Sequence, residues 1–394
     1  MKAGSALFQL MTATALAASA IAFAPAAAQT AQPPELQPEE SDVAPMPPLS
    51  PRWIFVSTAW AGQGTRIFDG DSGKMVGLIH HGPMANVTID PRAKSYYVSE
   101  TIWTKGNRGT RQDMVTVYDA KTMNLVREIP LPGRQLVSFR KNNFTVSADG
   151  RYGYSYNMDP ASSIVVVDLD KNRVVQNIEV PGCGLSFAAV NDVVGSLCAD
   201  GTIALAKVGS KAEVGHSASF FSAEDDPIFD NIVIDPTGKA TMLSYTGLIY
   251  EAKLDAPELA SGGAVAPGWS VQEAAGMPKP TSAPVVANWF PGGRQPLAVH
   301  RASGKLFVLM HMGEYWSQKE GGEEVWVLDG ASKKLLARRK LPDHAGLIEV
   351  TQDAKPLVYV NNEAGKLWVF DAETFALKYE LSDVGSGILA TAAK

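Results

Sequence analysis

The sequence predicts an all-β fold, a seven-bladed β-propeller, from two patterns that recur after residue 52. The first is an apolar run that ends in aspartate and is followed by a turn and a second strand. The second is a separate hairpin, with an Asp-Gly or Asp-Pro-x-Gly turn, that precedes most copies of this run. The copies recur about every 50 residues, which is the scale of a propeller blade. No helical periodicity competes with this pattern.

Seven copies of the aspartate run set the expected number of blades. The clear copies are Thr65–Asp69, Val115–Asp119, Ile164–Asp168, Val325–Asp329 and Leu367–Asp371, and the weaker ones are Thr202–Ala206 and Gly247–Glu251. The longest interval precedes Val325 and contains a Gly/Ala/Pro-rich insertion at residues 255–287. This insertion is either an eighth blade or a long loop. We expect seven blades.

The preceding hairpins complete a unit of four short strands. The clearest are Phe144–Tyr156, Ile232–Ser244 and Leu297–Leu309. Each carries a glycine in its turn, where a residue without a Cβ adopts positive φ without strain. Two loops are longer than a hairpin needs, residues 102–114 and 311–324, and both are polar and aromatic. Long loops of this kind usually carry binding functions.

The N-terminal part is expected to precede the propeller as two separate segments. Residues 1–28 have one early lysine, then an Ala-rich apolar stretch, and then small residues at the positions of a cleavage site. This order is typical of an export signal cleaved near Ala28. The alternative is a membrane anchor, which the polar residues within the stretch disfavour, and no later segment has the length of a membrane span. Residues 29–51 are Pro-rich and acidic, a linker or an arm that wraps a partner subunit. The propeller is expected at 52–394.

Charge and cysteine content exclude several functions. A net charge of −6 makes nucleic acid a poor partner, because that affinity comes from lysine and arginine on phosphates. Two cysteines are too few for a multi-cysteine zinc or iron–sulfur site. Export lets Cys183 and Cys198 pair. Their spacing is not that of a C-x-x-C redox motif, so a structural disulfide is favoured over a redox-active pair.

The sequence shows no self-sufficient active site. It has no nucleophile elbow, P-loop or zinc-protease motif. His311 and Glu314 are expected in a loop, where their spacing is only a weak metal signal. The acidic pair Asp225-Asp226, before a proline, is either catalytic or an Asx turn, and the turn is favoured. No catalytic residue and no metal ligand is therefore assigned to this chain.

Several ordered motifs resemble the heavy subunit of the tryptophan tryptophylquinone amine dehydrogenases, the methylamine and aromatic amine enzymes. The motifs are Arg108–Asp113 with Val115–Asp119, the pair Cys183/Cys198, Asp225–Phe229, Ser244–Gly247, Asn288–Gly293 and His300–Gly304. The last three look closer to the aromatic amine branch. The resemblance extends over essentially everything after the signal peptide.

This resemblance implies a periplasmic α2β2 enzyme that deaminates primary amines, aromatic ones in particular, to aldehyde and ammonia. The quinone cofactor would belong to a small, disulfide-rich light subunit, and electrons would pass to a blue-copper protein such as amicyanin or azurin. In the family, an aromatic residue of the first blade gates the amine channel. Trp60 is the matching candidate here, in a Gly-rich stretch that departs from the family, and Trp103 is the second candidate. An ordinary structural role is the alternative for both tryptophans.

Two rival functions remain open at this point. A stand-alone exported propeller of the lactonase type would need carboxylate and amide ligands around a metal at the ring centre, and no such set can be assembled from the sequence. A binding scaffold would need no quinone partner at all.

Overall fold

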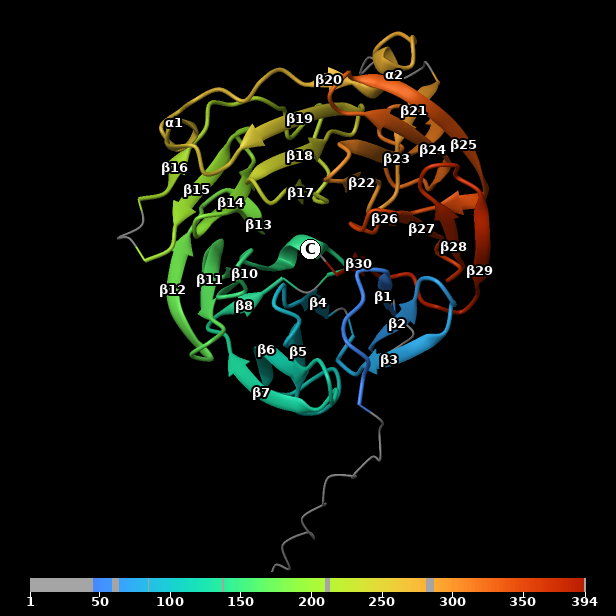
Figure 1. Ribbon diagram of the computed structural model, residues 1–394. Helices are drawn as coiled ribbons and strands as arrows, with labels where there is room; N and C mark the ends of the chain where they lie inside the picture. Colours follow the sequence, from blue (N-terminus) through green and yellow to red (C-terminus); the bar gives the residue numbers. More distant parts are fainter. Residues whose placement is uncertain are drawn as a thin grey trace, which may run out of the picture. The chain divides into compact units, whose positions relative to one another are not determined.

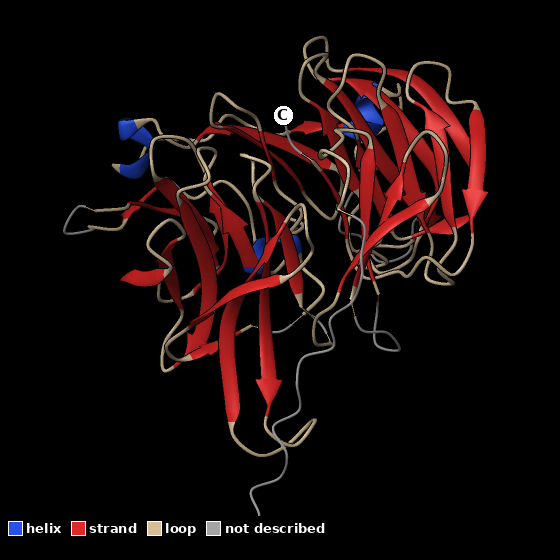
Figure 2. Cartoon of the chain, turned by 60° about the horizontal axis from the view of Figure 1, so that its bottom comes forward, coloured by secondary structure: helices blue, strands red, loops and turns tan. Residues whose placement is uncertain are grey.

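A computed structural model describes residues 45–58, 64–83, 85–136, 138–209, 213–280 and 287–392. Seven antiparallel sheets form a ring around a central axis, as Figure 1 shows, and the seven-bladed propeller is confirmed. Strands dominate the described chain, and its helices are few and short (Figure 2). None of the described helices has the length and apolarity to cross a bilayer.

The first four sheets in chain order are made of the following strands. The first contains β1 (Trp53–Ser57), β2 (Thr65–Asp69) and β3 (Met75–Ile79) and is completed by the last strand, β30 (Leu389–Thr391). The second contains β4 (Asn86–Ile89), β5 (Ser95–Trp103), β6 (Arg111–Asp119) and β7 (Leu125–Pro130). The third contains β8 (Arg134–Gln135), β9 (Phe144–Val146), β10 (Tyr152–Asp159) and β11 (Ser163–Asp168), with β12 (Arg173–Glu179) outermost and the 3-10 helix η1 (Lys141–Asn143) before β9. The fourth contains β13 (Cys183–Ala188), β14 (Val193–Cys198), β15 (Ile203–Lys207) and β16 (Gly215–His216).

The remaining three sheets complete the ring. The fifth contains β17 (Val233–Ile234), β18 (Lys239–Leu243), β19 (Leu248–Lys253) and β20 (Trp269–Ser270). The sixth contains β21 (Asn288–Pro291), β22 (Leu297–His300), β23 (Lys305–Gly313), β24 (Gly322–Asp329) and β25 (Lys334–Ala345). The seventh contains β26 (Leu347–Val350), β27 (Leu357–Asn361), β28 (Leu367–Asp371) and β29 (Leu377–Leu381). Helices α1 (Pro257–Ala260) and α2 (Val271–Ala274) flank β20.

The insertion at 255–287 is not an eighth blade in its described part. It supplies β20, the outer strand of the fifth sheet, which pairs with β19, and the two short helices. Its residues 281–286 lie outside the described residues. The expected signal peptide at residues 1–28, most of the expected Pro-rich arm and Trp60 lie outside them as well.

The aspartate that ends each clear repeat caps the turn to the outermost strand. The Asp371 carboxylate accepts hydrogen bonds from the backbone N–H of Glu373 (3.0 Å) and Thr374 (2.8 Å) and from the Thr374 hydroxyl (2.9 Å). The same pattern recurs at Asp119 with Lys121 and Thr122. Hydrogen bonds to the charged carboxylate favour ionisation, and the backbone N–H of Thr374 is the main reason that the pKa of Asp371 is lowered. At Asp168 the backbone N–H of Lys171 makes the corresponding hydrogen bond without a hydroxyl, so the carboxylate is the part of the motif that the clear repeats share.

The core lies between the blades. Trp326 and Trp368, both interior strand residues, are 0% and 1% exposed. The ring is closed by pairing β30, from the end of the chain, with β1, from its beginning, in the register Phe55↔Ala390. A ring has no free sheet edge at this joint, because the two ends of the chain share one blade.

Candidate functional site

The candidate site is a bowl at the centre of one face of the ring. It has a volume of about 780 Å³. We define the central bowl by its lining residues: 138–140, 182–185, 197–199, Phe221, Ala223, 227–230, Tyr245, 293–294, 318–319 and Glu363. Several of these lie in or beside the loops that join the second and third strands of their blades. We call this side of the ring the loop face, and Trp103 precedes the equivalent loop of the second blade.

Four of the motifs that carry the family resemblance meet at this bowl. The disulfide Cys183–Cys198 forms part of its wall, as do Pro227–Phe229 and Tyr245. Gly293 ends a further motif and also lines the bowl, with a φ of +102°. A Cβ there would lie 2.5 Å from the carbonyl oxygen of Gly346, so only glycine fits. Motifs that are far apart in sequence therefore build one surface.

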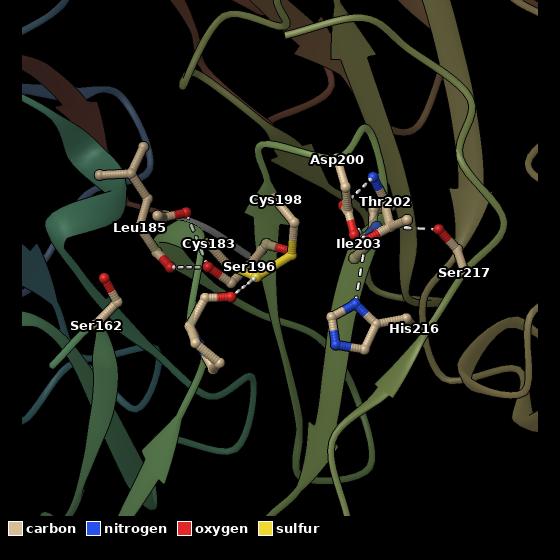
Figure 3. Close-up of a disulfide and its surroundings, with 12 residues drawn as sticks. Ser162, Cys183, Leu185, Ser196, Cys198, Asp200, Thr202, Ile203, His216 and Ser217 are labelled. Carbon is tan, nitrogen blue, oxygen red and sulfur yellow. Dashed lines mark hydrogen bonds between the residues drawn. A yellow bond between two sulfur atoms is a disulfide. The ribbon is translucent and has the colours of Figure 1, made fainter.

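The disulfide bridges two neighbouring strands of the fourth blade. Cys183 and Cys198 are register partners across β13 and β14, and both are buried (Figure 3). Beside them the Ser196 hydroxyl lies 2.9 Å and 2.8 Å from the carbonyl oxygens of Gly184 and Leu185, where the β13 ladder is interrupted. The cross-link thus fixes a part of the bowl wall where the backbone pairing is irregular.

The floor of the bowl is a charged layer across the axis of the ring. The segment around η1 reaches into the middle of the ring (Figure 1), where Arg140 forms an ion pair with Asp230 and Lys141 forms one with Glu349. The space within this layer is about 10 Å³, at the lower limit for one water molecule. A second cavity, of about 500 Å³, lies beyond it and shares Lys141 as a lining residue. The axis is therefore a plugged channel rather than an open pore.

Trp103 is the last residue of β5, is half-buried and does not line the central bowl. The guanidinium carbon of its ladder partner, Arg111, lies 5.9 Å from the centroid of its ring. Arg111 is in turn held by both carboxylate oxygens of Asp113 at 2.7 Å and by the carbonyl oxygen of Gln135 at 3.0 Å. The Arg108–Asp113 motif thus braces the long β5–β6 hairpin. Much of the expected loop 102–114 is strand, because this network extends the ladder to Trp103.

His311 lies in strand β23, and its expected placement in a loop is wrong. It is 1% exposed and is paired with Phe290 of β21. Its Nε2 lies 2.8 Å from the hydroxyl of Ser317, which in turn bonds the carbonyl oxygen of Glu314. Burial lowers the pKa of His311. The described residues contain no group of three His, Cys, Asp or Glu side chains arranged to hold a metal.

His311 thereby anchors the loop that carries Trp316. Trp316 is 47% exposed and meets the ring of Tyr245 edge-on at 5.8 Å. It belongs to a set of exposed apolar side chains at strand ends or loops on the loop face, which also includes Ile102, Met158 and Met312. They lie on the second, third and sixth blades, so the loop face presents apolar side chains at several points around the ring.

The acidic pair separates into two environments. Asp225 accepts a hydrogen bond from Ser222 in the expected turn, at 3.0 Å. Asp226 instead accepts hydrogen bonds from the backbone N–H (2.8 Å) and the hydroxyl (2.7 Å) of Thr246. These bonds connect the Asp225–Phe229 motif to the Ser244–Gly247 motif. Burial raises the pKa of Asp226 and outweighs these hydrogen bonds.

This pKa shift predicts the pH dependence of an Asp226→Asn variant. Because the folded-state pKa of Asp226 lies above its unfolded value, its contribution to stability is present at acid pH and is lost as pH rises through the folded pKa. Asp226→Asn should therefore gain stability relative to the native chain as pH rises above about 4, the unfolded pKa of an aspartate. Urea unfolding at several pH values measures this difference.

The matched control for this prediction is Asp371→Asn, which should lose stability relative to the native chain as pH rises, whereas Asp226→Asn should gain it. The pKa of Asp371 is lowered on folding, so its contribution is present at neutral pH and is lost as pH falls. Equal pH dependence in the two variants would contradict the assignment for Asp226.

Arg294 was missed in the sequence although it directly follows the Asn288–Gly293 motif. It lines both the bowl and the charged layer below it, and its guanidinium donates to the carbonyl oxygen of Ser386 and lies over the Phe139 ring, 5.8 Å from its centroid. Burial lowers its pKa. A single arginine is not a recognisable catalytic motif in a sequence. The residues that surround Arg294 come from other blades, which are distant in the sequence.

Comparison with known proteins agrees with the motifs. The family profile of the methylamine dehydrogenase heavy chain matches residues 57–392. The methylamine dehydrogenase heavy chain of Methylobacillus flagellatus is 30% identical over 315 residues, which cover 78% of this chain and 75% of that protein. That of Methylophilus methylotrophus is 28% identical over 312 residues, 77% of this chain and 73% of the relative.

Solved structures support the fold alone. A functionally unknown protein from Desulfotomaculum acetoxidans superposes with a TM-score of 0.58 at 12% identity, covering 86% of this chain and 98% of that one. The dihydro-heme d1 dehydrogenase NirN superposes with a TM-score of 0.53 at 17% identity, covering 91% of this chain and 79% of that one. Since the family profile spans nearly the whole propeller, the chain belongs to the methylamine dehydrogenase heavy chain family.

Proposed function

We propose that this chain is the large subunit of a periplasmic quinoprotein amine dehydrogenase, exported with its signal peptide cleaved near Ala28. The enzyme converts a primary amine and water into an aldehyde, ammonia, two protons and two electrons, and the electrons pass one at a time to a blue-copper protein of the amicyanin or azurin type. The observation that carries the proposal is the family match over residues 57–392, whose motifs meet at the central bowl.

In this proposal the chain is a platform and the chemistry belongs to its partner. The tryptophan tryptophylquinone of a small, disulfide-rich light subunit supplies the oxidation, in an α2β2 assembly. The loop face is where we place that subunit, because it combines the bowl with the exposed apolar side chains Ile102, Met158, Met312 and Trp316. Trp60 and Trp103 remain the proposed channel residues of this chain. A lactonase-type or scaffold function has no supporting observation in the described residues.

The substrate class is proposed to be aromatic amines. This choice rests on the motifs Ser244–Gly247, Asn288–Gly293 and His300–Gly304, which look closer to the aromatic amine branch. Tyr245 in the first of them meets Trp316, so an aromatic pair is available beside the bowl. Aromatic side chains favour aromatic ligands through edge-on and stacked contacts.

The test is purification of the chain from its own host, followed by a visible spectrum before and after addition of amine. We expect a small co-purifying subunit and a quinone band that bleaches with a primary amine, and faster with 2-phenylethylamine than with methylamine. Faster bleaching with methylamine would keep the dehydrogenase and reject the aromatic class. A colourless chain that purifies alone would reject the dehydrogenase.

A further inference from the structure

Arg294 at the base of the central bowl has no carboxylate partner. Its guanidinium bonds the backbone carbonyl of Ser386 and contacts the Phe139 ring, and it forms no ion pair with any described residue. Arg294 is half-buried, and its guanidinium keeps N–H donors that are not used within the part of the chain that the structure describes. Burial lowers the pKa of Arg294, and the attraction of Glu363, which forms no ion pair with it, offsets this effect only in part.

The other charged groups of the bowl do not compensate Arg294. Arg140 is paired with Asp230, so these two cancel. Lys319 and Glu363 are exposed, so water screens them, and the attraction of Glu363 offsets only part of the effect of burial on Arg294. The described lining therefore carries three cations and two anions, and Arg294 is the cation at its base that forms no ion pair.

Apolar groups form much of the wall above this charge. Phe221, Phe229, Leu185 and Leu197 line the bowl together with the disulfide. The position of Arg294 is set by the backbone, because Gly293 packs directly against Gly346. A fixed guanidinium at the base of an apolar cup suits a carboxylate, which it can bind with two parallel hydrogen bonds.

From this geometry we infer that Arg294 receives a carboxylate of the light subunit, an acidic side chain or the C-terminus, inserted into the central bowl. The inference rests on the proposed function, since it needs a partner on the loop face. The charge selects against a protonated amine in the same place, because an ammonium group would be repelled by Arg294. The base of the bowl is thus an assembly site, and the Tyr245–Trp316 pair, not Arg294, is where the aromatic amine is expected.

The test measures the dissociation constant of the light subunit from the heavy chain in purified enzyme, by sedimentation across a dilution series. Arg294→Gln should raise this constant by roughly 30-fold or more, because the partner's carboxylate is left buried without its counter-charge. Arg294→Lys keeps the charge but loses the paired hydrogen-bond geometry. Its dissociation constant should lie between those of the native enzyme and Arg294→Gln. Arg127→Gln, which removes an exposed guanidinium on the outer strand β7, should leave the constant unchanged.

Thermal unfolding of the isolated heavy chain separates assembly from folding. Arg294→Gln removes a partly desolvated charge that forms no ion pair, so its melting temperature should be equal to or above that of the native chain. A melting temperature that falls while assembly is unchanged would show a structural arginine and overturn the inference. Equal dissociation constants for Arg294→Gln and Arg127→Gln would also overturn it.

A free anion is the remaining occupant, and benzoate titration of the assembled enzyme tests it. Binding of benzoate that depends on Arg294, with assembly unaffected, would assign the bowl to a small carboxylate and overturn the inference. If the native chain purifies without any light subunit, the proposed function itself fails and this inference fails with it.

Discussion

Removing residues 386–394 should prevent the chain from forming a stable ring. These residues include β30, whose loss would leave the inner edge of β1 without its ladder from Ile54 to Val56. Leu389 is 0% exposed, and its backbone also exchanges hydrogen bonds with the Gln295 side chain at 3.2 Å in both directions. One such leucine contributes about 2–5 kcal/mol, and the strand's hydrogen bonds add to this. The sum approaches the entire stability of a typical domain, about 5–15 kcal/mol.

The measurement is thermal unfolding of the truncated chain, or its yield as soluble protein where it does not accumulate. Leu389→Ala serves as the graded control and should lower the free energy of unfolding by about 2–5 kcal/mol without abolishing the fold. A synthetic peptide of residues 384–392 should restore part of the stability of the truncated chain, since it supplies the missing strand. An unchanged melting temperature after truncation would show that the ring does not depend on this joint.

Replacing both Cys183 and Cys198 by alanine should lower the free energy of unfolding by roughly 3 kcal/mol, because the native disulfide closes a loop of 15 residues. The double variant avoids a lone thiol. Denaturant unfolding of the two proteins under the same conditions measures the difference. Because the disulfide lines the central bowl, the variant should also bind the light subunit more weakly than the native chain does.

Reductant provides the independent control for this prediction. Adding it should move the unfolding midpoint of the native chain towards that of the double variant, and it should leave the double variant unchanged. If the double variant unfolds at the native midpoint, the cross-link contributes nothing to stability. The unfolded chain would then have the same conformational freedom with and without the disulfide.

The blades could be predicted because their determinants are local. Each aspartate run carries its own strand pattern and its own turn, such as Asp371 with Thr374, so the seven copies are readable in order along the chain. The insertion at 255–287 could not be resolved in this way, because whether β20 pairs with β19 is a property of the blade and not of its own two residues. His311 was misplaced for a related reason, since its strand extends only where Phe290 pairs with it.

The sequence by itself therefore determined the repeat, the number of blades, the cysteine pair and the motifs that carry the family resemblance. Tertiary structure alone decided what those motifs do together. It gathered Cys183, Phe229, Tyr245 and Gly293 around one bowl and left Arg294 at its base without an ion pair among the described residues. The physical reason is that strand and turn preferences act over a few residues, whereas burial and charge compensation depend on which blades face each other across the ring.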